Sequence, residues 1–247
     1  MSKDMTILEE IDKRMAKINK IRPFEGEYLK QVYRFFKIET TFSSNAIEGN
    51  THTLTETKVI LEDGITVGGR TLNEFYEVEG HGKAYDFMFT LMNKKDILEE
   101  ELLYCHKLFS QNIPDFISPG EYRKVRVFVT GSRKRFPKAE ELPEKLKAFF
   151  DWFTKDRRKH HPVMFAAEAH RRYVNIHPFT DGNGRVSRLL MNTCLYQDRY
   201  FPVSIPLILK TDYINFLEKN KAKEFGYFIA ELELGVIKDL MRMLHIR

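Results

Sequence analysis

The sequence predicts an all-α domain that carries one small β-hairpin, and two observations lead to this fold class. Apolar residues recur every three or four positions along most of the 247 residues, which is the period of an amphipathic helix. One short segment alternates instead, because Val125, Val127 and Val129 are each separated by a single residue, as in a strand. The turn signal Gly131-Ser132 follows, so residues 133–137 are expected to form the return arm of a hairpin.

The helices of the first half follow from apolar spacing and from the residues that interrupt it. A stripe that includes Ile7, Ile11 and Ile18 predicts a helix that Pro23 ends. A second apolar face runs over 28–40. The string Glu48-Gly49-Asn50 is typical of a helix end, because Gly and Asn tolerate the left-handed C-terminal position. Further helices are expected over 53–61, 72–92 and 97–109, with a loop at 64–69.

Proline and glycine residues organise the second half. Pro114, Pro119 and Gly120 end the helical pattern before the hairpin. Pro162 suits a first helical turn and opens a helix that runs to residue 175. No internal repeat interrupts the pattern, so the length fits one large domain, or one domain with a helical extension. The other expected helices cover 146–153, 184–198, 211–220 and 226–244.

The composition excludes several classes of protein and leaves the partner open. The 40 Lys and Arg against 35 Asp and Glu give a net charge of +5, an excess too small to indicate nucleic acid by itself. No apolar run approaches the ~18–20 residues of a membrane span, and the N-terminus lacks the apolar core of a signal peptide. Cys105 and Cys194 lie far apart in apolar runs, where buried free thiols are expected. A reducing, cytoplasmic location follows, with neither nucleic acid nor membrane as a partner.

Residues 177–188, with the sequence HPFTDGNGRVSR, depart from ordinary packing patterns. Gly182 and Gly184 lack side chains, so the backbone amides of this turn can approach a ligand. The helix that follows presents free N–H groups and the positive end of its dipole, which together form an anion site. Arg185 and Arg188 lie three apart and are expected on similar sides of that helix, which suits a polyphosphate.

Two further residues of this stretch carry chemistry. Asp181 can hold the Mg²⁺ that accompanies phosphates, and His177 can act as a general base near neutral pH. Taken residue by residue, the stretch is also consistent with a Gly-Asn-Gly turn beside a surface pair of arginines. The complete string decides between these two interpretations.

The complete string resembles the signature of the Fic (Fido) family, H-x-F-x-[DE]-G-N-G-R-x-x-R, and matches it at every fixed position. Residues 161–170 and 188–192 are similar to the family's helices on either side of the signature. The string Gly120-Glu121-Tyr122-Arg123 resembles the start of the family's β-hairpin flap. The resemblance covers roughly residues 100–220 and implies a Fic-type helical domain with a small β-hairpin flap.

The resemblance also implies a protein adenylyltransferase (AMPylase), which moves AMP from ATP to a Ser, Thr or Tyr hydroxyl of a target protein or of itself. By position, His177 would deprotonate that hydroxyl, and Asp181 would bind Mg²⁺. Tyr213 is either a core residue of its helix or, like its family counterpart, part of the adenine pocket. The implied ATP-binding residues are Asp181, Gly182, Asn183, Gly184, Arg185, Arg188 and Tyr213, with Val127, Phe128, Val129 and Thr130 of the flap.

A second string, Ser43-Ser44-Asn45-Ala46-Ile47-Glu48-Gly49-Asn50, places Ser44 and Glu48 four apart on one helix face. Seen alone, it is a plain helix end. It resembles the family's inhibitory motif, [ST]-x-x-x-E-[GN], and its position ahead of the core resembles class II of the family. The resemblance implies that Glu48 pairs with Arg188 where the γ-phosphate of ATP would lie, so weak activity is expected from the isolated enzyme.

These expectations divide the chain into three regions. Residues 1–95 form a helical region with the inhibitory motif, 96–225 the catalytic core with its flap near 122–137, and 226–247 a C-terminal helix packed on the core. Two alternatives stay open: a hydrolase that removes AMP from a modified protein at the same site, and a non-catalytic nucleotide-binding interaction module. Class II relatives are often dimers, so a homodimer is expected by resemblance.

Overall fold

The computed structural model describes the backbone of residues 3–22, 24, 26–114, 116–128 and 134–246, with side chains from residue 7 onward. Within these ranges, ten α-helices and five short 3₁₀ helices alternate with turns and irregular loops. The helical fold class predicted from the spacing of apolar residues is therefore confirmed.

Most helix boundaries follow the sequence pattern closely, but the helix Leu142–Asp156 extends beyond the predicted 146–153 at both ends and the helix Ala222–Met243 begins before the predicted residue 226. The second helix runs on to Glu48, so the helix end expected there is confirmed. The α-helices are α1 (Lys3–Ile18), α2 (Gly26–Glu48), α3 (Leu54–Asp63), α4 (Leu72–Thr90), α5 (Glu99–Ser110), α6 (Leu142–Asp156), α7 (Pro162–Ile176), α8 (Asn183–Gln197), α9 (Lys210–Glu218) and α10 (Ala222–Met243). The 3₁₀ helices are Asn19–Ile21, Leu91–Asn93, Ala139–Glu141, Arg157–Lys159 and Leu207–Leu209.

Two helices begin at a capping box, a start signal contained in the local sequence. Thr53 precedes α3 and Thr71 precedes α4, and each threonine side chain accepts a hydrogen bond from the backbone N–H three residues on. The glutamates at those positions, Glu56 and Glu74, accept in return from the backbone N–H of the threonine. The second box fixes the start of α4, the helix that brings Glu77 to the site described below.

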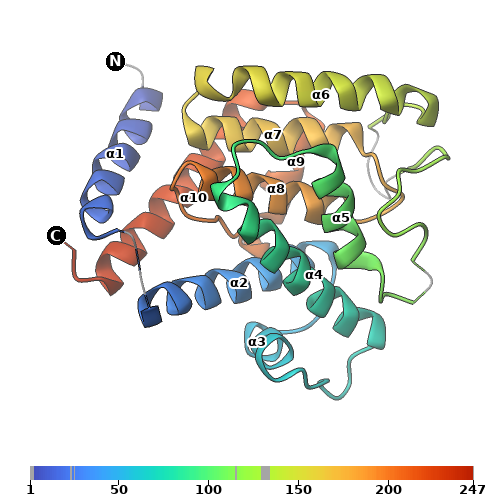
Figure 1. Cartoon of the computed structure of the whole chain (residues 1–247), viewed down its shortest axis with the longest axis horizontal. Helices are drawn as coiled ribbons and strands as arrows, with labels where there is room; N and C mark the ends of the chain where they lie inside the picture. Colours follow the sequence, from blue (N-terminus) through green and yellow to red (C-terminus); the bar gives the residue numbers. More distant parts are fainter. Residues whose placement is uncertain (1–2, 23, 25, 115, 129–133, 247) are drawn as a thin grey trace.

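Helix α8 lies at the centre of the fold, and its neighbours form the surroundings of the site (Figure 1). Residues 185–195 of this helix are all buried. Helix α7 packs along α8, which also contacts α2, α4 and α5. Because two of the enclosed side chains are arginines, they need polar partners inside the protein.

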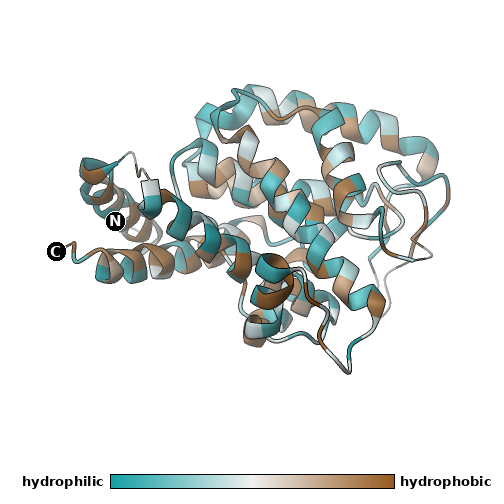
Figure 2. Ribbon diagram, turned by 60° about the horizontal axis from the view of Figure 1, so that its bottom comes forward, coloured by the Kyte–Doolittle hydropathy of each residue, from teal (hydrophilic) through white to brown (hydrophobic). Residues whose placement is uncertain are grey.

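Helix α1 packs against α10, at the side of the molecule where both ends of the chain lie (Figure 1). Ile11 and Ile18 of the α1 stripe are fully buried. Figure 2 shows how hydrophobic and hydrophilic residues separate into different faces along these helices. The N-terminal helix, which matches no sequence motif, therefore joins the hydrophobic core.

The flap segment (residues 122–137) corrects the prediction of a hairpin. Its described residues, 122–128 and 134–137, contain no strand and follow an irregular path. The predicted positions Val129, Thr130 and residues 131–133 lie outside the described residues. A physical reason for the irregular path of these described residues is the side chain of Arg123. It binds the backbone carbonyl groups of Val125 and Pro137, which would otherwise be available for hydrogen bonds between two strands.

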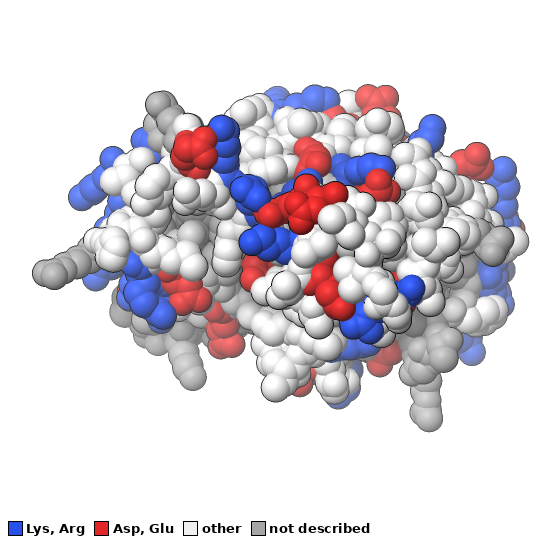
Figure 3. All heavy atoms as spheres, turned by 90° about the horizontal axis from the view of Figure 1, so that it is seen from below, with Lys and Arg blue, Asp and Glu red and all other residues white. Residues whose placement is uncertain are grey.

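Three further predictions concern the surface and the thiols. Cys105 and Cys194 are buried free thiols, as predicted. No helix in the described part of the chain combines the length and the apolar character needed to cross a membrane. On the face drawn in Figure 3, acidic and basic side chains are interspersed, which agrees with the small net charge.

Candidate active site

The signature loop (residues 177–182) joins α7 to α8 and is closed by one side chain. Asn183 accepts a hydrogen bond from the backbone N–H of Phe179 and donates one to its carbonyl, both at 2.9 Å. The backbone turns left-handed at His177, with φ 53°, and at Gly182, with φ 77°. Asn183, predicted as a phosphate ligand, is 2% exposed, so its side chain is used to fix the loop.

His106 of α5 packs against this loop and holds it in place, a role that no sequence motif indicates. Its ring stacks on Phe179 with 3.7 Å between centroids and an interplanar angle of 3°. Nδ1 accepts a hydrogen bond from the Gly120 backbone N–H at 2.9 Å, so the ring proton lies on Nε2, which donates to the Asp181 carbonyl at 3.1 Å. Burial lowers the pKa of His106 to about 4. A single histidine in an apolar helix carries no sequence signal of this role.

His177 is held as a neutral base. Its Nδ1 lies 3.2 Å from the Val174 carbonyl, which can only accept, so Nδ1 carries the proton and Nε2 keeps its lone pair. The Phe136 ring packs against the imidazole with 4.0 Å between centroids. Burial lowers the pKa of His177 to about 4, so the ring is uncharged at neutral pH. This geometry is what a general base requires.

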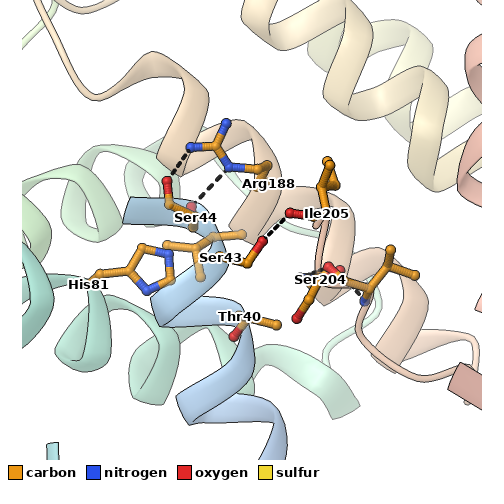
Figure 4. A pocket seen from close by; sticks show the side chains of 10 residues that line it. Thr40, Ser43, Ser44, His81, Arg188, Ser204 and Ile205 are labelled. Atoms are coloured by element: carbon orange, nitrogen blue, oxygen red, sulfur yellow. Dashed lines mark hydrogen bonds between the residues drawn. The ribbon is translucent and has the colours of Figure 1, made fainter. Parts of the chain in front are cut away.

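Arg188 donates four hydrogen bonds to partners from two other helices. Its Nη2 lies 2.6 Å from Oε1 of Glu48, at the end of α2, and also donates to the Ser44 carbonyl at 3.0 Å. Its Nε donates to the Ser44 hydroxyl at 2.9 Å (Figure 4). The Nη1 donates to the Tyr213 hydroxyl of α9 at 3.1 Å. The pairing of Glu48 with Arg188 that the resemblance implied is therefore present in this structure.

The two partners of this ion pair differ in exposure. The side chain of Arg188 is 5% exposed and that of Glu48 is 34% exposed. Desolvation opposes ionisation of Glu48, but the charges of Arg188 and Arg185 outweigh it and hold its pKa below the ordinary value. Glu48 is therefore ionised at neutral pH and faces solvent on one side, where an incoming phosphate would compete with it.

Gly184 provides the space for this ion pair. A Cβ atom at this position would lie 2.5 Å from Glu48 Oε1 and 3.0 Å from Arg188 Nη1. The glycine was predicted to let backbone amides approach a ligand. In this structure it also lets the Glu48 carboxylate lie directly over the first turn of α8.

Tyr213 lies in the core and connects Arg188 to a second buried histidine. Its side chain is 1% exposed. The hydroxyl that accepts from Arg188 also lies 2.9 Å from Nε2 of His170 on α7. Burial lowers the pKa of His170 well below its ordinary value, so this histidine adds no positive charge beside Arg188.

Arg185 and Arg188 bind different partners, although the charges of both act on Glu48. Its Nη1 lies 2.8 Å from Glu77 Oε1 on α4, and its Nη2 lies 3.4 Å from Asp181 Oδ2. The guanidinium also stacks 4.2 Å from the centroid of the Phe109 ring. Residues three apart leave the same side of a helix, but the long arginine side chains reach different helices because several helices surround α8. Glu77 carries no motif that could have predicted this partner.

A small cavity lies behind Arg188, between α2, α4 and α8 (Figure 4). Its volume is about 10 Å³, which corresponds to about one water molecule. The lining includes Thr40, Ser43, Ser44, His81 and Ser204. The cavity is too small for a nucleotide.

Asp181 is the best placed acid for a cation. Its side chain is 67% exposed, and its Oδ1 accepts a hydrogen bond from the Gly182 N–H at 2.6 Å. No cluster of three or more metal-binding side chains exists among the residues that the structure describes. One exposed carboxylate nevertheless fits Mg²⁺, because this ion is commonly held by one or two carboxylates together with substrate phosphates.

The flap positions predicted to border the nucleotide are placed only in part. Val127 is half-buried and Phe128 is 84% exposed. The other two positions, Val129 and Thr130, lie outside the described residues. The described flap segment reaches the site through Phe136, which packs on His177.

Comparisons with known proteins agree with this site. A model of the Fic/DOC family matches residues 96–195 of the chain, a range that contains the whole signature loop. The protein adenylyltransferase Fic of Nematostella vectensis is 34% identical over 229 residues, which are 92% of this chain and 53% of that relative. The chain belongs to the Fic/DOC family. It spans about half the length of the curated relatives it matches.

Two solved structures have the same fold. Fic-1 from C. elegans superposes with a TM-score of 0.88 at 26% identity, and the match covers 98% of this chain and 73% of that one. A Fic domain-containing signalling protein from Bacteroides thetaiotaomicron VPI-5482 superposes with a TM-score of 0.84 at 26% identity, covering 93% and 94%. The helical arrangement around the signature loop is therefore shared with both proteins.

Proposed function

We propose that this chain is a protein adenylyltransferase that transfers AMP from ATP to a Ser, Thr or Tyr hydroxyl of a protein. One observation carries the proposal. A single loop has the neutral imidazole of His177, with its free Nε2, at one end and the N-terminus of α8, the helix that carries the buried Arg188, at the other. The names of the relatives, protein adenylyltransferase Fic, support the same activity.

The proposed reaction is a displacement at the α-phosphorus of ATP. His177 Nε2 takes the proton of the target hydroxyl while the hydroxyl oxygen forms a bond to that phosphorus. The bond from this phosphorus to the bridging oxygen breaks, and pyrophosphate leaves with the electron pair. The products are an AMP ester of the protein and pyrophosphate. A general base contributes about 10²–10⁴-fold to such a step.

Different residues of the loop and of α8 would each bind a different part of the triphosphate. Free backbone N–H groups at the start of α8 favour an anion there, helped by the positive end of the helix dipole. Arg188 would bind the γ-phosphate once Glu48 leaves it. Asp181 would hold Mg²⁺, which neutralises phosphate charge when bound. Arg185 contacts Asp181, so its charge would act on the phosphates together with that carboxylate.

Glu48 would inhibit the transfer by occupying the donor that the γ-phosphate needs. Its carboxylate lies 2.6 Å from Arg188 Nη2, and it carries the same sign of charge as ATP. ATP bound without Arg188 would lack the contact that sets the direction of its phosphates. This arrangement supports an autoinhibited, class II type of enzyme.

The flap segment would align the target protein. Val125 and Phe128 are 58% and 84% exposed, and Phe136 of the same segment packs on His177. Exposed apolar side chains on the segment that also contacts the base suit contacts with an extended segment of a partner protein. The hydroxyl to be modified would then be presented to Nε2.

The test uses Glu48→Gly with ATP labelled on either the α- or the γ-phosphate. We expect label from the α-phosphate, and none from the γ-phosphate, to enter protein bands of a cell lysate or the enzyme itself. Asp63→Gly is a matched control, because Asp63 is the last residue of α3 as Glu48 is of α2, and it is exposed. Transfer of the γ-label, or no transfer at all from Glu48→Gly, would contradict the proposal.

Removal of AMP is a second candidate for the unmodified chain. Glu48 is ionised and a third exposed, so it could orient a water molecule near the site. The test adds the unmodified protein to a target that the Glu48→Gly variant has labelled with AMP. Release of AMP that depends on both Glu48 and His177 would establish this activity, and stable label would exclude it.

A further inference from the structure

We propose that Arg123 is a positioning residue that ties both described arms of the flap segment to the backbone of His177. The inference rests on the proposed function, because it concerns how the base and the target-binding segment are kept in register. Arg123 touches neither the nucleotide nor the reacting atoms in this assignment. It acts through His177 and through the segment that covers it.

Four hydrogen bonds carry the inference. The guanidinium donates to three backbone carbonyls: Nε to His177 at 2.7 Å, Nη1 to Val125 at 2.8 Å and Nη2 to Pro137 at 2.7 Å. The backbone N–H of Arg123 donates to the Pro178 carbonyl at 2.9 Å. One side chain therefore joins the outgoing arm, the returning arm and the start of the signature loop.

Arg123 is a buried charged residue, and the cost of burying a charge is unusual for a residue that only closes a loop. It is 3% exposed, and no carboxylate of the described residues lies within ion-pair distance of it. Glu140 acts on it only at longer range, and burial lowers its pKa. A buried cation requires strong compensation, which three charge-assisted bonds to carbonyls supply. A neutral side chain could join two arms of the segment at a lower desolvation cost. The property that only arginine supplies is the rigid, forked guanidinium, whose donors reach three carbonyls at once.

His177 needs such support because its backbone conformation is unfavourable. Its φ of 53° lies in the left-handed region, which residues other than glycine rarely adopt. Arg123 holds the carbonyl of this residue, while Phe136, from the arm that Arg123 also holds, packs on its ring. Lys134 fixes the same arm by donating to the Leu217 carbonyl at 2.8 Å. The position of the flap segment and the orientation of the base therefore depend on one another.

The experiment compares Arg123→Gln and Arg123→Lys in the Glu48→Gly background. Arg158→Gln is the matched control, because Arg158 is an exposed arginine outside the flap segment and the signature loop. We expect Arg123→Gln to lower the AMP transfer rate at saturating ATP by about ten- to hundredfold, since small misplacements of a reacting group have effects of this size. The KM for ATP and the stoichiometry of ATP binding should stay within about twofold of the parent, because phosphate contacts are unchanged.

Arg123→Lys should fall between parent and Arg123→Gln, because it keeps the charge but cannot reach three carbonyls together. The control should stay within about twofold of the parent. If the rate per ATP-binding site is unchanged in Arg123→Gln, Arg123 only stabilises the fold and the inference is wrong. If Arg123→Gln fails to fold, the same comparison is made with Arg123→Lys.

Hydrogen exchange separates this inference from the proposed function. In Arg123→Lys, the hydrogen-bonded amides on the two sides of the contact, those of residue 123 and of residues 177 and 179, should exchange faster together, while those of α2 should be unchanged. Faster exchange on one side alone would contradict the joint role of Arg123. Because this measurement needs no activity, it remains decisive even if the parent variant transfers no AMP.

Discussion

The two ends of the signature string (residues 177–188) are held by different kinds of contact. At Arg188, a carboxylate, a serine and a tyrosine from α2 and α9 bind a guanidinium on the rigid helix α8. At His177, the guanidinium of Arg123 binds an irregular stretch of backbone through carbonyl groups alone. A carboxylate competes with phosphate for an arginine, whereas a backbone carbonyl belongs to the fold and carries no net charge.

This difference separates two kinds of contact. The contacts of Arg188, here called the regulatory end, can regulate activity, whereas the contacts of His177, here called the positioning end, only position the base. The contact at Arg188 can be displaced by an anion of higher charge, so breaking it should raise activity. The contacts at His177 support the base itself, so breaking them should lower activity. Substitutions at the two ends are therefore predicted to have opposite signs, and the predictions below test this from the largest effect to the smallest.

His177→Ala tests the positioning end directly and should have the largest effect. In the Glu48→Gly background, loss of the base should reduce AMP transfer by about 10²–10⁴-fold. ATP binding, measured by calorimetry, should change little because the imidazole donates nothing to the phosphates. His160→Ala is the matched control, since His160 is exposed and lies outside the site. Full activity of His177→Ala would remove the base from the mechanism.

Glu48→Gln tests whether the regulatory end works through charge. A hydrogen bond to a charged group contributes about 1.5–3 kcal/mol, so losing the contact in Glu48→Gly should raise the transfer rate about ten- to hundredfold. Glutamine keeps an acceptor for Arg188 but removes the negative charge, and its rate should lie between those of the unmodified protein and Glu48→Gly. Initial rates at subsaturating ATP measure this. A rate for Glu48→Gln equal to that of the unmodified protein would show that charge has no part in the inhibition.

Ser44→Ala tests the smaller contribution within the same contact. The variant loses the hydroxyl bond to Arg188 Nε but keeps the backbone carbonyl bond to Nη2. A single hydrogen bond contributes about 1 kcal/mol, so basal transfer should rise about fivefold. Ser43→Ala is the matched control, because its hydroxyl binds the Ile205 carbonyl (Figure 4) and not Arg188. An equal rise in the control would show that the effect comes from loosening α2.

The fold could be predicted from the sequence wherever its cause is local. Apolar spacing and the Gly49 helix end depend on neighbours within a few positions, so most of the helices were predicted within about two residues of their boundaries, whereas α6 (Leu142–Asp156) extends beyond the predicted 146–153 at both ends. The flap segment could not, because an isolated two-stranded hairpin is marginally stable and tertiary contacts decide its form. Arg123 binds the carbonyl of His177, 54 residues further along the chain, which alternation of valines cannot reveal.

The site was predictable in its residue types and less so in its pairings. The signature string named His177, Asp181 and both arginines, and the inhibitory string named Ser44 and Glu48. The partners of Arg185, Phe179 and Tyr213 were not predictable, because Glu77, His106 and His170 lie on other helices and belong to no motif. Such contacts depend on how helices pack, which the order of residues in a single segment does not determine.

The pH dependence of AMP transfer also tests the contacts of His177, and it is the smallest of the predicted effects. Burial lowers the pKa of His177 to about 4, while Asp181 and Glu48 act to raise this pKa and Arg123 acts to lower it. Protonated imidazole cannot accept a proton, so activity of the Glu48→Gly variant should stay level as pH falls to about 5 and decline around pH 4.

Phe136→Ala removes the ring that packs against the His177 imidazole, so water can hydrate the charged form more easily. The midpoint of the pH–activity profile should therefore rise toward 6.5, the ordinary pKa of histidine. The rate at pH 5.5 should then fall a few-fold relative to the plateau, and the effect should be small at pH 8. Phe128→Ala is the matched control, because Phe128 is an exposed phenylalanine of the same flap segment. A midpoint near 6.5 in the parent as well would mean that His177 is solvated already, and the difference between the two ends of the signature string would then reduce to the contacts of Arg188.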